Sequence, residues 1–119
     1  MCIRDRVQLA LGEAYARIEA IKVMNWRMAW GLEQGQLDMA QASAVKVHST
    51  ESPIEVYRLL LEVLGPIGGL RKGSPGAVLH GRIGEEARAC QINTFGGGVN
   101  EVQREIVAMA GLRMPRSPR

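Results

Sequence analysis

The feature that most constrains the fold is a helical periodicity near the start of the chain. Between Val7 and Leu32, apolar residues recur in steps of three and four, at Leu11, Ala14, Ile18, Ile21, Met28 and Leu32. This spacing predicts one long amphipathic helix over residues 7–32. No strand-like alternation of apolar and polar residues appears anywhere, so the expected fold class is all-α, most simply an antiparallel four-helix bundle.

Further helices are predicted downstream, separated by glycine and proline. Residues 37–65 continue an apolar face, and Pro53 within them removes a backbone donor, which predicts a kink or a division of that helix. Residues 65–76, "GPIGGLRKGSPG", predict a loop, and the helical pattern of residues 77–93 is weak.

The last helix carries the clearest end signals. We expect Asn100 to be its N-cap and Gln103 to complete a capping box, with Gly111 and Pro115 stopping it.

Length and charge limit how the chain can be divided into a domain and its flanking ends. A chain of 119 residues fits one domain, which we place at residues 7–112. The first six residues, "MCIRDR", are interpreted as a non-native or truncated leader, with the true chain continuing upstream. The basic tail at residues 113–119 is interpreted as a solvated end rather than a nucleic-acid-binding arm, because elsewhere the 15 basic and 12 acidic residues are interleaved.

Cysteine and histidine usage suggests neither a disulfide framework nor a metal site. Cys2 and Cys90 are far apart in sequence and have no histidine at ligand spacing, and His48 and His80 have no supporting acidic cluster. No apolar run is long enough to span a membrane or to form a signal peptide. A reduced, cytoplasmic setting is therefore expected.

The stretch "FGGGVNEVQRE", residues 95–105, places three glycines just before a predicted helix. Such glycines let a ligand approach the backbone, where free N–H groups and the helix dipole favour an anion. The stretch is neither a dinucleotide fingerprint nor a phosphate-binding P-loop, and its spacing alone is also that of a plain turn between helices.

The longer stretch "NTFGGGVNEVQREIVAMAGLRMPR" resembles the C-terminal signature of the acyl-CoA dehydrogenase family, with its glycine triplet, "NE-x-QR" and "GL-x-x-PR" elements. Upstream, "YARIEAIKVMNWRMAWGLEQGQ" and "ASAVKVHSTE...YRLLLEVLGP" resemble two long bundle helices of that family. The resemblance implies that the chain is roughly the last third of such a protein.

The resemblance also implies an activity. Members oxidise acyl-CoA thioesters to trans-2-enoyl-CoA: a carboxylate removes the α-proton, and the β-hydride passes to FAD, for later transfer to an electron-transfer flavoprotein or a similar acceptor. In many members the base is a glutamate at the position of Gly97. Either the base precedes Val7, as in some branches of the family, or the chain belongs to a non-catalytic partner subunit of a hetero-oligomer.

Binding residues follow from the same resemblance. Gly98, Val99 and Glu101 occupy the FAD-contacting loop positions, while Glu62 and Gly65 occupy those at the end of the second bundle helix. Val99 replaces a usual threonine, and a carboxylate at Glu62 would repel a pyrophosphate unless a cation intervenes.

Gly96, Gly97 and Phe95 would border the substrate; Phe95 could equally pack under the loop. Trp26 and Trp30 are better explained as core or subunit interface than as pocket walls. Homo- and hetero-oligomers, dimeric or tetrameric, remain open, and so does a free-standing helical interaction module.

Overall fold

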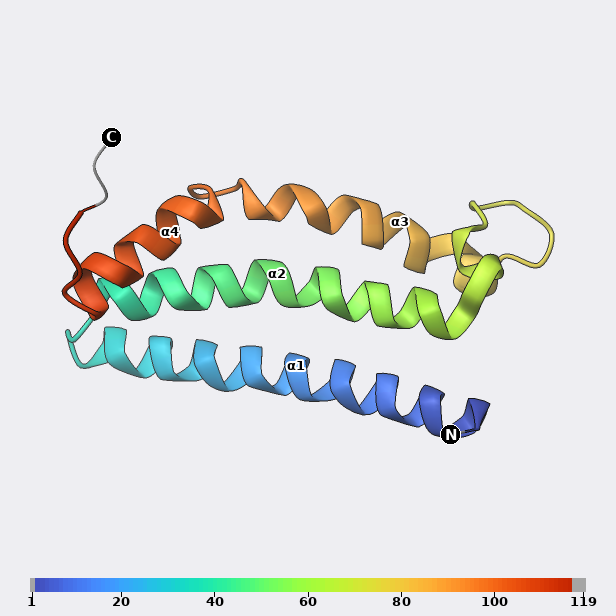
Figure 1. Cartoon of the computed structure of the whole chain (residues 1–119), viewed down its shortest axis with the longest axis horizontal. Helices are drawn as coiled ribbons and strands as arrows, with labels where there is room; N and C mark the ends of the chain where they lie inside the picture. Colours follow the sequence, from blue (N-terminus) through green and yellow to red (C-terminus); the bar gives the residue numbers. More distant parts are fainter. Residues whose placement is uncertain (1, 117–119) are drawn as a thin grey trace.

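The computed structural model describes residues 2–116. Its helices are α1 (Ile3–Glu33), α2 (Met39–Leu64), α3 (Arg82–Ala89) and α4 (Asn100–Ile106), and these described residues contain no strand, which confirms the all-α prediction. α1 and α2 run antiparallel, and α3 and α4 follow each other end to end along the other side of α2 (Figure 1). The four helices therefore form three rows, with α2 in the middle.

The first helix begins at Ile3, earlier than the predicted start at Val7. The backbone N–H of Cys2 donates to the Asp5 carboxylate at 3.1 Å, and this bond closes the first turn. The origin of residues 1–6 stays a prediction, as does the role of the basic tail, and residues 1 and 117–119 lie outside the described residues.

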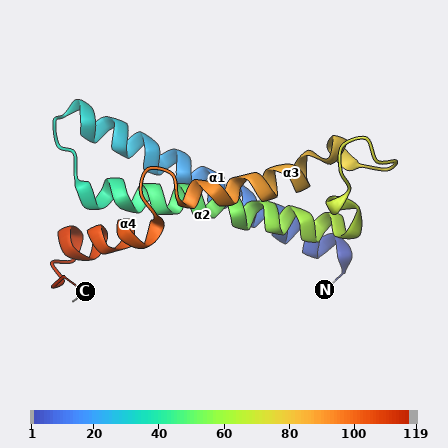
Figure 2. The same cartoon turned by 90° about the horizontal axis from the view of Figure 1, so that it is seen from above.

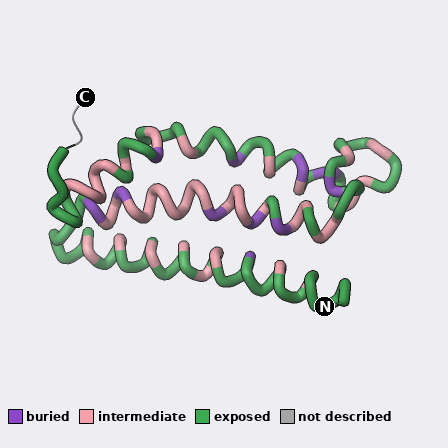
Figure 3. Tube along the Cα trace, viewed as in Figure 1, coloured by how far each residue is buried: buried purple, intermediate pink, exposed green. Residues whose placement is uncertain are grey.

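Only part of the predicted apolar face of α1 is covered. Ala14 is buried and Ile21 and Met28 are half-buried against α2, whereas Leu11, Ile18 and Leu32 are exposed. The buried face of α1 is thus narrower than the predicted apolar face, because the helix that packs along α1 is α2 (Figure 3). Viewed from above, α1 crosses α2 at an angle and diverges from it at one end (Figure 2).

The second helix runs unbroken from Met39 to Leu64 with Pro53 inside it, so Pro53 does not divide this helix, and a kink at that position stays a prediction. Asp38 caps its start by accepting the Ala40 N–H at 2.8 Å. Helices pack on both sides of α2, and this packing holds its backbone in place around the missing proline donor.

The predicted loop at residues 65–76 begins with a 3₁₀ turn, η1 (Gly65–Gly69), so the loop prediction is wrong for those residues. The weakly helical residues 77–93 form a second 3₁₀ turn, η2 (Val78–Gly81), then α3, and then η3 (Cys90–Thr94). Gly84 in α3 allows a close approach, since a Cβ there would lie 2.8 Å from the Gly68 carbonyl oxygen. A final π-helical turn, η4 (Val107–Gly111), extends α4.

The molecule is long and thin. Its radius of gyration is 17.8 Å, whereas a compact domain of this length has about 13.5 Å. Its accessible surface is 8668 Å², against about 6,300 Å² for a compact monomer of this mass. The buried apolar residues are few and mostly small, namely Ala14, Ala40, Val56, Leu59 and Cys90.

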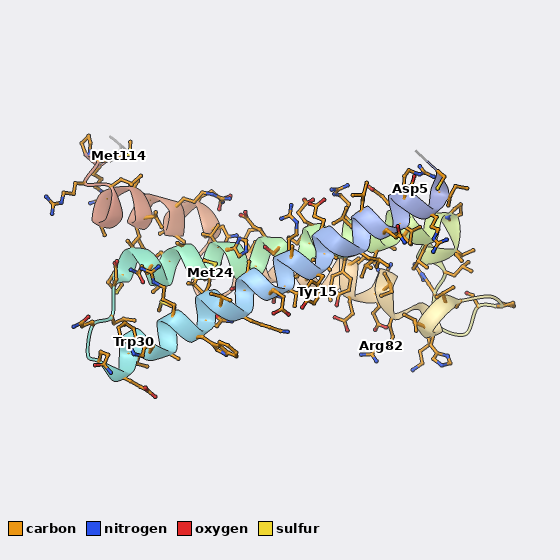
Figure 4. The ribbon with its side chains drawn as sticks, turned by 90° about the horizontal axis from the view of Figure 1, so that it is seen from below. Asp5, Tyr15, Met24, Trp30, Arg82 and Met114 are labelled. Carbon is orange, nitrogen blue, oxygen red and sulfur yellow. The ribbon has the colours of Figure 1, made fainter. Side chains whose placement is uncertain are left out.

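Large apolar side chains contribute to this extra surface. On α1, the large side chains of Tyr15, Trp26 and Trp30 are 66%, 75% and 62% exposed. Figure 4 shows Tyr15, Met24 and Trp30 spread along this helix. Within residues 2–116, no helix is both long enough and apolar enough to cross a membrane.

Candidate functional site

The glycine loop, residues 95–99, joins η3 to α4. It lies where the row of α3 passes into that of α4, above the N-terminal half of α2 (Figure 1). Phe95 is 70% exposed, so it does not pack beneath the loop, and all three glycines are exposed. The loop therefore presents a short stretch of accessible backbone that no side chain covers.

Two of the glycines are needed for the backbone shape. Gly97 and Gly98 have φ of 67° and 96°, in the region that side chains disfavour. A Cβ at Gly98 would also lie 2.7 Å from Nε2 of Gln103, whereas one at Gly97 would meet nothing within 4 Å. Gly97, which the sequence resemblance places at the position of the family base, thus has open space around it but carries no side chain.

Asn100 does not cap the last helix, which corrects the sequence prediction. Val99 is the N-cap residue, and Asn100 is the first helical residue, with its side chain only 2% exposed. Gln103 does not complete a capping box either, because its Nε2 donates to the Gly97 carbonyl at 3.4 Å. The Asn100 amide instead points at α2, where its Nδ2 donates to Oε1 of Glu51 at 2.9 Å and to Oγ1 of Thr50 at 3.0 Å.

Lys46 of α2 joins the two ends of the loop. Its Nζ donates to the Thr94 carbonyl at 3.0 Å and to Oδ1 of Asn100 at 2.5 Å. These contacts were not predicted from the sequence, because Lys46 reads there as one more charge in an amphipathic pattern and its partners lie 48 and 54 positions away.

Glu51 and Arg104 extend this network. Arg104 donates to Oε2 of Glu51 at 2.7 Å and ties α4 to α2. Burial acts to raise the pKa of Glu51, but hydrogen bonds from Asn100 and Arg104, with the charges of Arg104 and Lys46, outweigh it and hold that pKa below its ordinary value. Glu51 is therefore a carboxylate at neutral pH.

The two groups of predicted FAD contacts lie apart within one chain. Val99 is half-buried and Glu101 is exposed beside the loop, whereas Glu62 and Gly65 lie at the far end of α2. From Lys46 to Glu62 the helix rises by about 24 Å, at about 1.5 Å per residue. Glu62 pairs with Arg58, so its carboxylate has a neighbouring cation that offsets its charge.

A cleft of about 510 Å³ lies away from the glycine loop, none of whose residues line it. It lies between α1, α2 and α4, and its charged rim is formed by Arg17, Glu51, Glu55 and Arg104. Because it is open to solvent, it is a groove on the surface rather than an enclosed ligand pocket.

Comparison with known proteins identifies the relatives of this chain. Residues 4–112 match the family described as "Acyl-CoA dehydrogenase, C-terminal domain". Two proteins of Mycobacterium tuberculosis (strain ATCC 25618 / H37Rv) are similar: Acyl-CoA dehydrogenase FadE26 at 50% identity over 95% of this chain, and Acyl-CoA dehydrogenase FadE29 at 39% over 97%. The chain spans 29% of the length of each.

Solved structures are also similar to this chain, in fold and in sequence. The ChsE4–ChsE5 complex from Mycobacterium tuberculosis matches with a TM-score of 0.86 at 50% identity, over 94% of this chain and 29% of that one. A protein described as the Tcur3481–Tcur3483 steroid ACAD matches with a TM-score of 0.88 at 48% identity, over 93% of this chain and 29% of that one.

Proposed function

Because this chain belongs to the acyl-CoA dehydrogenase family, as its C-terminal domain, we propose that it forms part of the FAD site and of the assembly surface of a flavin-dependent acyl-CoA dehydrogenase. The observation that carries the proposal is the glycine loop, whose exposed backbone lies at the sequence signature of the family. The whole enzyme would be longer, since this chain spans 29% of its relatives.

The residues present fit FAD in two respects. Gly96, Gly97 and Gly98 leave the loop without side chains, so a phosphate or ring edge can approach the backbone. Arg58, which also pairs with Glu55, places a shared cation beside Glu62, where a carboxylate near a pyrophosphate requires one. We propose Gly98, Val99 and Glu101 as contacts in the loop, and Glu62 and Gly65 as contacts at the end of α2.

The separation of these two groups supports a shared site. One bound FAD would take loop contacts from one subunit and α2 contacts from another, because about 24 Å of helix lies between them within a chain. The oligomer would then be required for cofactor binding. Two solved relatives carry names that join two subunits, one of them printed as a complex, and this favours a hetero-oligomer.

For the chemistry, FAD would accept the β-hydride of the acyl-CoA thioester. The chain would contribute orientation and water exclusion at the loop, where Phe95, Gly96 and Gly97 would border the substrate. Gly97 cannot accept a proton, so we propose that the base that removes the α-proton precedes Val7 or belongs to a partner subunit.

The substrate we propose is an acyl-CoA with a steroid-sized acyl group, because a relative at 48% identity is described as a steroid ACAD. An electron-transfer flavoprotein or a similar carrier would reoxidise the flavin, and the setting would be cytoplasmic. These assignments rest on the relatives and not on any residue of the loop.

The test uses the full-length protein, purified with FAD and assayed with an artificial electron acceptor. Expressed together with its partner subunit, it should retain FAD and oxidise a steroid-sized acyl-CoA faster than a straight-chain one of similar mass. Turnover by the full-length protein alone would refute the hetero-oligomer. Failure of the assembled protein to bind any FAD would refute the flavoenzyme assignment itself.

A further inference from the structure

The ends of the glycine loop are held by a single side chain. Thr94 and Asn100 flank residues 95–99, and Nζ of Lys46 donates to both, at 3.0 Å to the Thr94 carbonyl and 2.5 Å to Oδ1 of Asn100. One ammonium group of α2 therefore fixes the distance between the point where the loop leaves η3 and the point where it enters α4.

The loop has few other attachments. The side-chain contact within it is the bond from Gln103 to the Gly97 carbonyl, which is long at 3.4 Å. Glycines lose more conformational freedom on ordering than other residues, so three in a row make a loop that is costly to order. A ligand that binds this backbone binds more tightly when the loop is ordered beforehand.

We call Lys46 and its two acceptors, Thr94 and Asn100, the Lys46 clamp. The acceptor side chain, that of Asn100, is itself held in place. Asn100 is 2% exposed, and its amide is bonded to Lys46, Thr50 and Glu51. Arg104 binds the second oxygen of Glu51, so the position of Asn100 is held from both α2 and α4. A part-buried ammonium makes stronger hydrogen bonds to the Thr94 and Asn100 oxygens than a neutral donor would.

We propose that Lys46 is a positioning residue that holds the glycine loop in the conformation that binds FAD. The identity of the ligand, FAD, rests on the proposed function. The contacts of Lys46 with Thr94 and Asn100 do not, because they are present in the protein without cofactor. Lys46 does not touch the exposed side of the loop through any described contact, so its effect on FAD acts through Thr94 and Asn100.

The first experiment replaces Lys46 by methionine in the full-length, assembled protein. Lys46→Met keeps the length of the side chain and removes its donors, and the matched control is Lys22→Met, which removes an exposed lysine paired with Glu19. We expect the dissociation constant of FAD to rise about tenfold in Lys46→Met and to stay unchanged in the control, at a temperature where all variants are folded. An unchanged FAD constant in Lys46→Met would overturn the proposal.

A second set of variants tests the acceptor. Asn100→Ala removes it and should weaken FAD binding as Lys46→Met does. The double variant Asn100→Asp with Glu51→Gln exchanges amide and carboxylate, so that Lys46 keeps an oxygen acceptor and the Asn100–Glu51 hydrogen bond is reversed in direction. This exchange should restore FAD binding to within about threefold of wild type; binding as weak as in Asn100→Ala would overturn the role of the acceptor.

Hydrogen exchange separates the clamp from the cofactor. In the protein freed of FAD, the amides of Phe95 and Gln103, which donate to the Ile92 and Val99 carbonyls at the two ends of the loop, should exchange at least about tenfold faster in Lys46→Met than in wild type, because each opening of the loop becomes easier. Equal exchange would refute the clamp. If wild type binds no FAD, the proposed function fails, yet this comparison still decides whether Lys46 orders the loop.

Discussion

At the scale of single residues, the three glycines of the loop are not equivalent. Gly97 and Gly98 adopt positive φ, and a Cβ on Gly98 would meet Gln103. Gly96 has an ordinary backbone, and the nearest atom to a Cβ there is 3.9 Å away. The need for glycine is thus strongest at the third position of the triplet.

This difference predicts unequal effects of the same substitution on stability. Gly98→Ala should lower the free energy of unfolding by about 1–2 kcal/mol, because alanine is strained at positive φ. Gly96→Ala, the matched control, should change it by less than about 0.5 kcal/mol. Chemical denaturation of the full-length variants measures both; equal effects would contradict the assigned backbone conformation.

Glu51 gives the structure a dependence on pH. Its pKa is lower in the folded protein than its ordinary value, so the stability it contributes is fully present above that ordinary value and is lost as pH falls through the folded pKa. The melting temperature of wild type should therefore exceed that of Glu51→Gln at pH 7, and the gap should narrow below about pH 4.5. The exposed Glu33→Gln serves as control, and a gap that widens on acidification would contradict the sign of the shift.

At the scale of elements, glycines inside helices have different reasons to be there. Gly84 of α3 lies against the backbone of η1, where a Cβ would come within 2.8 Å of the Gly68 oxygen. Gly12 of α1 has nothing within 4 Å of the same position. One glycine permits packing, and the other only weakens its helix.

We predict that Gly84→Ala destabilises the protein by about 1–3 kcal/mol, because the two segments must move apart. Gly12→Ala should instead stabilise it by about 0.5–1 kcal/mol, since alanine is the better helix former. Thermal unfolding of the two variants beside wild type is the measurement. A destabilising Gly12→Ala would show that another segment packs closely on this side of α1.

Sequence reasoning was most successful where a pattern is long. The periodicity of residues 7–32 identified α1, because many positions contribute to it, and the signals between Asn100 and Gly111 located the last helix. Sequence reasoning failed where a contact between distant residues decides the role of a side chain. Asn100 looks like an N-cap in sequence, but Lys46 and Glu51, about 50 positions away, hold it against α2. Pro53 likewise does not end α2, since neighbouring helices pack along it.

At the scale of the whole molecule, the chain exposes more surface than a free domain of its mass. The excess is about 2,300 Å² over a compact monomer, an area typical of obligate interfaces. Apolar side chains such as Trp26 and Trp30 contribute to it. This surface is what a domain that packs against other parts of an enzyme requires.

The 119 residues alone should therefore associate. We expect the isolated chain to form oligomers in sedimentation experiments and to melt at a temperature that rises with concentration, because association buries the apolar faces. Replacing Trp26 and Trp30 by serine should reduce the association. A monodisperse monomer at all concentrations would support a free-standing helical module instead.

The most direct test of the central claim, that this chain completes a flavin-dependent acyl-CoA dehydrogenase, is an anaerobic titration. The full-length protein, assembled with its partner and loaded with FAD, would be titrated with a steroid-sized acyl-CoA while the visible absorbance of the flavin is recorded. We predict that the flavin is bleached in proportion to the acyl-CoA added. Bound flavin that no acyl-CoA reduces, or a protein that holds no flavin, would contradict the account.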